Sequence, residues 1–196
     1  MAYYPVMLNI QGKRCLVVGG GSVAHRKVLS LLECGAIVTV IAPVVNESIL
    51  KLWEESRIRL IRRNYIKSDL RGYFIVVAAS DDRDVNKLIA QEAGAEGVPV
   101  NVVDSRELSS FIMPSVIRRG DLTVAISTGG KSPLLSKMLR RKLEEILPAE
   151  CERLLKKLEE ARERAKEKEL PSQEKLKIYR EIIEDSELKN FFKNGG

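Results

Sequence analysis

A glycine turn follows an apolar run near the start of the chain. The run covers residues 15–18 and leads into Gly19, Gly20 and Gly21, with Ala24 completing the spacing Gly-x-Gly-x-x-Ala. In a dinucleotide-binding turn the first glycine permits the tight turn, Gly21 lets a pyrophosphate approach the backbone, and the small third residue lets the helix pack close to the strand. The helix N-terminus offers unpaired N–H groups to phosphates. The pattern therefore predicts a phosphate-binding turn after a buried parallel strand.

Two further polar positions follow apolar runs. Asp104 comes directly after the run at 99–103, and Ser-Asp-Asp at 80–82 follows the run at 73–79. Ligands of open α/β sheets bind outside the carboxyl ends of the strands, so a carboxylate beside a nicotinamide there could act as a general base. Position alone leaves a second interpretation for Asp104, a cap or turn residue. Residues 80–82 either line the cofactor crevice or begin the next helix.

A second glycine turn, Thr-Gly-Gly-Lys-Ser-Pro at 128–133, lies in the most basic part of the chain. Between residues 113 and 142 seven side chains are basic and one is acidic, which equals the net charge of +6 of the whole chain. We interpret this segment as the binding region for an anionic partner, with Lys131 as a mobile positive charge before a helix start. The basic residues are Arg118, Arg119, Lys131, Lys137, Arg140, Arg141 and Lys142.

The remaining chemistry-bearing residues are few. His25 is the only histidine and has no carboxylate or second ligand in view, so we expect a surface residue rather than a catalyst. Cys15, Cys34 and Cys151 are too scattered for a metal-ligand pair or a disulfide framework, and we expect small core residues. The sequence therefore predicts no metal site.

The end of the second strand bears on the choice of cofactor. A dinucleotide fold usually carries an acid there for the adenosine ribose, but residues 41–44 read Ile-Ala-Pro-Val. No arginine stands there to hold a 2′-phosphate either. The sequence therefore favours NAD over NADP.

The alternation of apolar runs and helical patterns predicts an α/β protein with a Rossmann-like doubly wound parallel sheet. A β-hairpin follows the sheet, and a charged helical region with an apolar stripe at Leu154, Leu155 and Leu158 ends the chain. Expected strands cover residues 8–10, 14–18, 36–41, 58–62, 73–79, 99–103, 111–117 and 122–127. Expected helices cover residues 22–33 (ending at Gly35), 46–55, 84–93 and 133–147, and the chain from 150 onward with a break at Pro171-Ser172; residues 94–97 are expected to be a loop.

Length and composition fit this architecture. A chain of 196 residues is long enough for one domain plus an appendage, and no apolar run approaches the roughly 20 residues that span a bilayer. The N-terminus lacks the pattern of a signal peptide, so we expect a cytoplasmic protein without a membrane partner. We expect three parts: a dinucleotide-binding domain at 1–112, a dimerisation and substrate-binding segment at 113–148, and a helical region at 149–196.

Five motifs occur in the order seen in precorrin-2 dehydrogenases and in the N-terminal part of siroheme synthases, which the chain resembles closely over residues 5–148. The motifs are Gly-Gly-Gly-Ser-Val-Ala-His-Arg-Lys at 19–27, Ala-Ala-Ser-Asp-Asp at 78–82, Asn-Val-Val-Asp at 101–104, Phe-Ile-Met-Pro-Ser at 111–115 and Ser-Thr-Gly-Gly-Lys-Ser-Pro at 127–133. The sequence departs from the family at His25, where many members have an acid, and at Thr128, where some have serine.

The resemblance implies NAD-dependent oxidation of precorrin-2 to sirohydrochlorin, on the way to sirohaem. It implies that Asp104 is the catalytic carboxylate and that members are homodimers whose middle segment forms much of the interface. The cofactor-binding residues would be Gly19, Gly20, Gly21, Ser22, Val23, Pro43, Val44 and Ser80. The resemblance includes no counterpart of the methyltransferase domain of siroheme synthases, so we expect the chain not to make precorrin-2 itself.

The charge count agrees with this substrate independently, because precorrin-2 carries eight carboxylates and the basic segment would attract and orient them. The substrate-binding residues would be Arg118, Arg119, Thr128, Gly129, Gly130, Lys131 and Arg140.

Alternatives remain at this point. The first alternative is a bifunctional enzyme that is also a sirohydrochlorin ferrochelatase. Some family members insert iron in this way, with the same carboxylate accepting the pyrrole N–H protons. A non-catalytic module that senses NAD and binds nucleic acid or a protein is another, although the sequence shows no aromatic-basic surface and no helix-turn-helix spacing. A purely structural dimer domain would leave the glycine turn without a purpose. We therefore expect an enzyme without a nucleic-acid partner.

Overall fold

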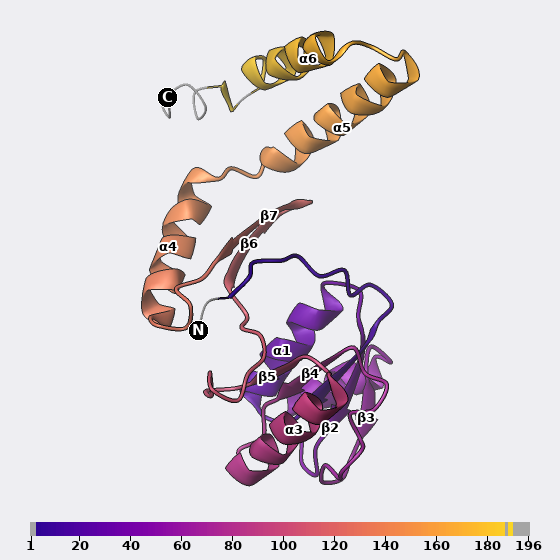
Figure 1. The fold of residues 1–196 in the computed structure, drawn as a ribbon, viewed down its shortest axis with the longest axis vertical. Coiled ribbons are helices and arrows are strands. Elements are labelled where there is room, and N and C mark those ends of the chain that lie inside the picture. Colours follow the sequence, from indigo (N-terminus) through magenta and orange to yellow (C-terminus); the bar gives the residue numbers. More distant parts are fainter. Residues whose placement is uncertain (1–2, 187, 190–196) are drawn as a thin grey trace. The chain divides into compact units, whose positions relative to one another are not determined.

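The computed structural model describes residues 3–186 and 188–189. The chain divides into two compact units, with the boundary between Met113 and Pro114 (Figure 1).

The first unit is built on a parallel sheet with the strand order β3-β2-β1-β4-β5. Its strands are β1 (Arg14–Val18), β2 (Ile37–Ile41), β3 (Arg59–Ile61), β4 (Ile75–Ala78) and β5 (Val100–Val102). Its helices are α1 (Ser22–Leu32), α2 (Glu47–Glu54) and α3 (Arg83–Glu96). The order reverses between β1 and β4, which is the switch point where ligands of doubly wound sheets bind. The predicted Rossmann-like fold class is confirmed.

Two apolar layers cover the two faces of this sheet. Cys15 and Val17 of β1 face one layer together with Val28 of α1, and α2 also packs there. Leu16 and Val18 face the other layer with α3. Because successive side chains of a strand point to opposite faces, the uninterrupted apolar run of β1 requires helices on both sides.

The ends of the helices follow from individual residues. Gly35, at a φ of +71°, donates to the Leu32 carbonyl while Ala36 donates to the Leu31 carbonyl, which is a Schellman ending of α1 and confirms the expected stop. The Asn46 side chain accepts from the Ile49 N–H at 2.9 Å and begins α2.

Two expectations about the first unit are wrong. Residues 8–10 form no strand in the described chain, because no neighbouring strand pairs with them, although Ile10 is buried. Residues 94–97 are not a loop: α3 continues to Glu96, and only Gly97, at a φ of +68°, leaves the helix. Gly94 is exposed within the helix, where its cost of about 1 kcal/mol is met by the packing of the opposite face.

The second unit begins with an antiparallel hairpin of β6 (Ser115–Arg119) and β7 (Leu122–Ile126), joined through Gly120 and Asp121. The expected strand from residue 111 starts later, because Ser110 and Phe111 donate to the Val100 carbonyl and stay with the first unit. Three helices follow: α4 (Pro133–Ile146), α5 (Cys151–Glu167) and α6 (Ser172–Glu184). Ser132 caps α4 with Pro133 in its first turn, as expected.

Two of the three residues of the expected apolar stripe of α5 pack in a small core, and Leu155 is half-buried outside it. Leu154 is buried with Cys151 and Leu188, and Leu158 packs against them. The other two cysteines also belong to a core: Cys15 is buried in the sheet and Cys34 packs beside it. No helix in the described part of the chain is both long and apolar enough to cross a membrane.

Candidate functional site

Four strands of the first unit end at the same edge of the sheet. Val18 pairs with Ile41 on one side and with Ala78 on the other, and Ala78 pairs with Val102. The residues that follow these four strand ends are therefore brought together, although they come from four distant parts of the sequence. They include the glycine turn, Pro43 and Val44, Ser80, and Asp104.

The glycine turn is held tightly by its neighbours. Gly19, at a φ of +135°, donates to the Ile41 carbonyl at 3.0 Å, and Gly20 accepts from the Asn46 N–H at 2.9 Å. A Cβ on Gly19 would lie 2.1 Å from the Ala79 oxygen, and one on Gly20 would lie 1.9 Å from the Val44 oxygen. Neither position can take a side chain without a backbone shift.

The other side of the turn is open, which fits the expected pyrophosphate. A Cβ on Gly21 would meet no atom within 4 Å, and Gly21 and Ser22 are exposed. Gly21 is the N-cap of α1, and no side chain caps this helix, so its first N–H groups stay available for an anion. Val23 is half-buried on the same turn.

The ends of β2 and β4 flank the turn. Pro43 and Val44 are exposed, and the Val44 carbonyl packs against Gly20. After β4, the Asn86 side chain accepts from the Ser80 N–H at 3.2 Å and donates to the Ser80 carbonyl at 2.8 Å. Asp82 caps α3 by accepting from two N–H groups of its first turn. Asp82 therefore starts the helix, as one interpretation of residues 80–82 expects, and the Ser80 backbone borders the glycine turn.

Asp104 lies at the same edge, one residue after Val103, whose N–H donates to the Ala78 carbonyl at 2.9 Å. Its φ of +58° is left-handed, a region that aspartate tolerates better than most residues. Asp104 is the third residue of a turn that the Ser105 N–H closes on the Val102 carbonyl at 3.2 Å, so the interpretation as a turn residue holds. Its side chain is exposed and accepts no hydrogen bond within residues 3–186 and 188–189. This unengaged carboxylate is suited to proton transfer.

Sequence reasoning missed one charged residue in this unit. Lys27 of α1 is half-buried, and its Nζ lies 2.9 Å from the Met113 Sδ. The available signal was its spacing from Ala24 and Leu31, which places it on the apolar stripe of the helix. His25 is half-buried on α1, and the described residues contain no group of three or more His, Cys, Asp or Glu side chains that could hold a metal ion.

The expected substrate-binding arginines of the second unit are partly engaged. Arg119 donates to the Leu147 and Glu144 carbonyls near the end of α4, a common use of cations at helix C-termini. Arg140 pairs with Glu144 one turn along α4. Arg118 is exposed on β6.

The glycine loop at residues 128–131 is more accessible to a ligand than Arg119 and Arg140 are. The Thr128 hydroxyl accepts from the Ser132 N–H and donates to the Ser132 carbonyl, both at 3.0 Å, which closes the loop. Gly129 and Gly130 have left-handed φ values, and Lys131 is exposed between the loop and α4.

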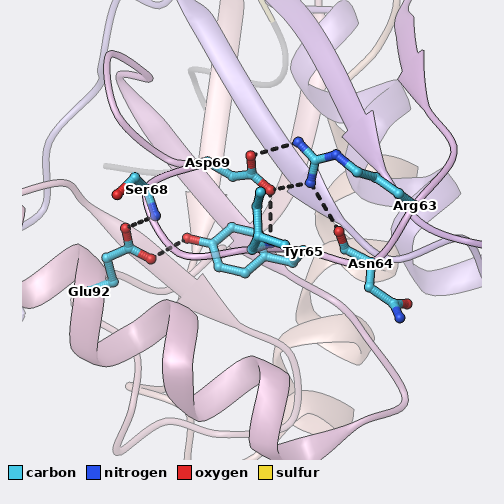
Figure 2. Close-up of polar contacts among 7 residues, drawn as sticks. Arg63, Asn64, Tyr65, Ser68, Asp69 and Glu92 are labelled. Carbon is cyan, nitrogen blue, oxygen red and sulfur yellow. Dashed lines mark hydrogen bonds and ion pairs between the residues drawn. The ribbon is translucent and has the colours of Figure 1, made fainter.

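A separate polar cluster ties the connection between β3 and β4 to α3 (Figure 2). Arg63 forms a bidentate pair with Asp69 at 2.6 and 2.7 Å, and this contact lowers the pKa of the Asp69 carboxyl. Tyr65 donates to the buried Glu92 at 2.6 Å, which also accepts from the Ser68 N–H. Burial and then this contact raise the pKa of Tyr65. The cluster is internally satisfied and has a structural role.

Comparison with known proteins gives two family matches. Residues 6–115 match a putative NAD(P)-binding family, and residues 119–146 match the central region of sirohaem biosynthesis proteins. The solved structure of SirC, a precorrin-2 dehydrogenase, is 32% identical, with a TM-score of 0.77 over 93% of this chain and 90% of SirC. The chain belongs to this family of NAD(P)-binding sirohaem-biosynthesis proteins.

Family members of greater length are similar over the same residues. The siroheme synthase of Methylobacillus flagellatus is 39% identical over 184 residues, which cover 94% of this chain and 39% of that protein. That of Methylococcus capsulatus is 41% identical over 167 residues, which cover 85% of this chain and 35% of that protein. The chain therefore spans between a third and two fifths of the length of these relatives.

Proposed function

We propose that the chain oxidises precorrin-2 to sirohydrochlorin with NAD, in sirohaem biosynthesis. The observation that carries this proposal is the joint position of the open glycine turn and the unengaged Asp104 carboxylate at one edge of the sheet. The similarity to SirC over nearly its whole length supports the same reaction.

The glycine turn would bind the dinucleotide. Gly19 and Gly20 fix the turn against β2 and β4, while the N–H groups of Gly21, Ser22 and Val23 would hold the pyrophosphate. Pro43 and Val44 would border the adenosine, and Ser80 the opposite side of the turn. When bound, NAD accepts the hydride that leaves the substrate.

Asp104 would accept the proton that the substrate loses. Its carboxylate is free of internal hydrogen bonds, so it can approach a substrate N–H or C–H without first breaking a contact. The anionic groups of the tetrapyrrole would meet the basic segment. Lys131 is exposed beside the loop of Thr128, Gly129 and Gly130, and Arg118 is exposed on β6. Arg119 and Arg140 would take part by exchanging their contacts with α4.

We also propose a homodimer formed through α4. Large apolar side chains on this helix are exposed, among them Leu134 at 68% and Met138 at 59%. An apolar face of this kind on a charged helix marks an interface. A cytoplasmic location is in keeping with the use of NAD and with three cysteines that are not joined in disulfides.

The proposal is tested by mixing the protein with NAD and enzymatically prepared precorrin-2 and following absorbance of NADH and of sirohydrochlorin. Both should rise together, and Asp104→Asn should slow this by about 10²–10⁴-fold while NAD binding persists. Asp84→Asn, on the exposed first turn of α3, is the control. Retention of DNA without any NADH would favour the binding-module alternative instead.

A further inference from the structure

A lysine interrupts the buried stripe of α1. Ala24, Val28 and Leu31 of this helix are buried, with exposed fractions of 3% or less. Lys27 lies three residues after Ala24 and four before Leu31, so it shares their face. A charged side chain at a core-facing position costs stability unless a partner compensates it. The contacts of Lys27 therefore need an explanation.

The described part of the chain offers Lys27 only a weak partner. Its Nζ contacts the Met113 thioether at 2.9 Å, and no carboxylate lies within ion-pair distance among the described residues. A thioether is a poor acceptor, and an ammonium has three donors to satisfy. Burial and the charge of Arg26 lower the pKa of Lys27, while the charge of Asp104 acts in the opposite direction.

This arrangement places the ammonium beside the reaction centre. Val103, the residue before Asp104, and Met113, whose thioether Lys27 contacts, pack against the same core as Ala24, Val28 and Leu31 of α1. The charge of Asp104 acts on Lys27 in keeping with this packing. Lys27 also lies on the helix whose N-terminus would bind the dinucleotide, about 8 Å along the helix axis from that end. An ammonium in such a place is well suited to an incoming anion.

We propose that Lys27 binds a carboxylate of the tetrapyrrole substrate and so anchors the ring beside Asp104. This rests on the proposed dehydrogenase function. The carboxylate supplies the charged acceptor that Met113 cannot, and the partial burial of Lys27 strengthens the contact relative to one on an exposed lysine. The first unit thereby contributes a substrate contact of its own.

The test measures binding of sirohydrochlorin, the product, in the absence of NAD, so the result does not depend on turnover. Lys27→Met should weaken binding about tenfold or more, since it removes a charge-assisted hydrogen bond. Lys27→Arg should retain affinity within about threefold. Lys51→Met, on the exposed side of α2, is the matched control and should bind as the wild type does.

Thermal stability separates a substrate-binding role of Lys27 from a structural one, because only a structural role predicts that Lys27→Met unfolds at a lower temperature than the wild type. Methionine has a similar length and no charge to desolvate, so Lys27→Met should unfold at the wild-type temperature or above. Lys27→Gln serves if the methionine variant does not fold. If folded Lys27→Met or Lys27→Gln binds sirohydrochlorin as tightly as the wild type, the proposal is overturned. It is also overturned if the variants lose affinity only because they unfold.

The two proposals fail in different ways. A wild-type protein that binds sirohydrochlorin through Lys27 but forms no NADH with precorrin-2 would contradict the dehydrogenase and leave the anion site standing. A protein that forms NADH normally in both wild type and Lys27→Met, with equal KM for precorrin-2, would contradict the role of Lys27 alone.

Discussion

Individual glycines of the first turn serve different purposes, and substitution can separate them. Gly19→Ala places a Cβ against the Ala79 carbonyl in a left-handed conformation, so we expect a loss of about 2 kcal/mol or more in the free energy of unfolding. Gly21→Ala meets open space at a φ of −85° and should leave stability nearly unchanged. Its methyl group would instead stand where the pyrophosphate approaches, and NAD affinity should fall about tenfold or more.

Thermal unfolding and calorimetric titration with NAD check this pair. Equal losses of stability in the two variants, or full NAD affinity in Gly21→Ala, would contradict the assignment of the open side of the turn to the cofactor.

The sequence predicts the role of a residue best where few structural positions favour that residue type. The glycine spacing and the acid after β5 could be found because strand ends of a parallel sheet meet at one edge. Lys27 was not found, because a lysine within a helix is usually solvated. Its spacing from Ala24 and Leu31 was the available signal, and its contact with Met113 shows the half-buried position. Arg119 was expected to face a ligand, yet the carbonyls at the end of α4 attract it, a contact that sequence spacing does not show.

At the level of elements, the connection between β3 and β4 owes its order to the cluster in Figure 2. Arg63 holds the pKa of Asp69 below its usual value, so the pair stabilises the fold above the unfolded pKa of about 3.9 and loses this effect as pH falls through the lower folded value. Asp69→Asn should therefore lower the melting temperature at pH 7 by a few degrees, and the difference from wild type should shrink at pH 3.

Glu96→Gln provides the comparison for this prediction. This change removes the ion pair between Arg71 and Glu96. The Arg71 side chain is 65% exposed and the Glu96 side chain 37%, whereas the Asp69 side chain is 12% exposed. Exposed pairs contribute little, so its effect at pH 7 should be much smaller. Similar losses in both variants at pH 7, or a pH-independent loss in Asp69→Asn, would refute the argument.

Element boundaries show where local pattern stops being informative. The buried strands β1, β2 and β4 were predicted within two residues at either end, because uninterrupted apolar runs have few other uses. Residues 8–10 have an apolar pattern but lack a neighbouring strand to pair with in the described chain, and Phe111 is held by hydrogen bonds to β5. Pairing of this kind depends on segments distant in sequence, which local propensity does not encode.

For the whole molecule, the uneven charge is the feature most directly open to experiment. The excess of basic residues between 113 and 142 should attract a polycarboxylate substrate through a long-range field. Replacing Arg118 and Lys131 with glutamine together should raise the KM for precorrin-2 several-fold and weaken its dependence on salt, with kcat changed less. Glutamines at Lys175 and Lys177 of α6 are the control. An unchanged KM would remove the basic segment from substrate binding.

The apolar face of α4 makes the last prediction about the whole molecule. Leu134, Leu135, Met138 and Leu139 are all at least 44% exposed, and a monomer has no physical reason to leave four neighbouring apolar side chains in water. A two-fold interface contains each residue twice, so Met138→Glu introduces two buried charges for each dimer and should shift sedimentation equilibrium to the monomer. Leu176→Glu, on the half-exposed face of α6, should leave the mass unchanged. A wild-type chain that sediments as a monomer would rule out this interface, and the exposed face would then need another partner.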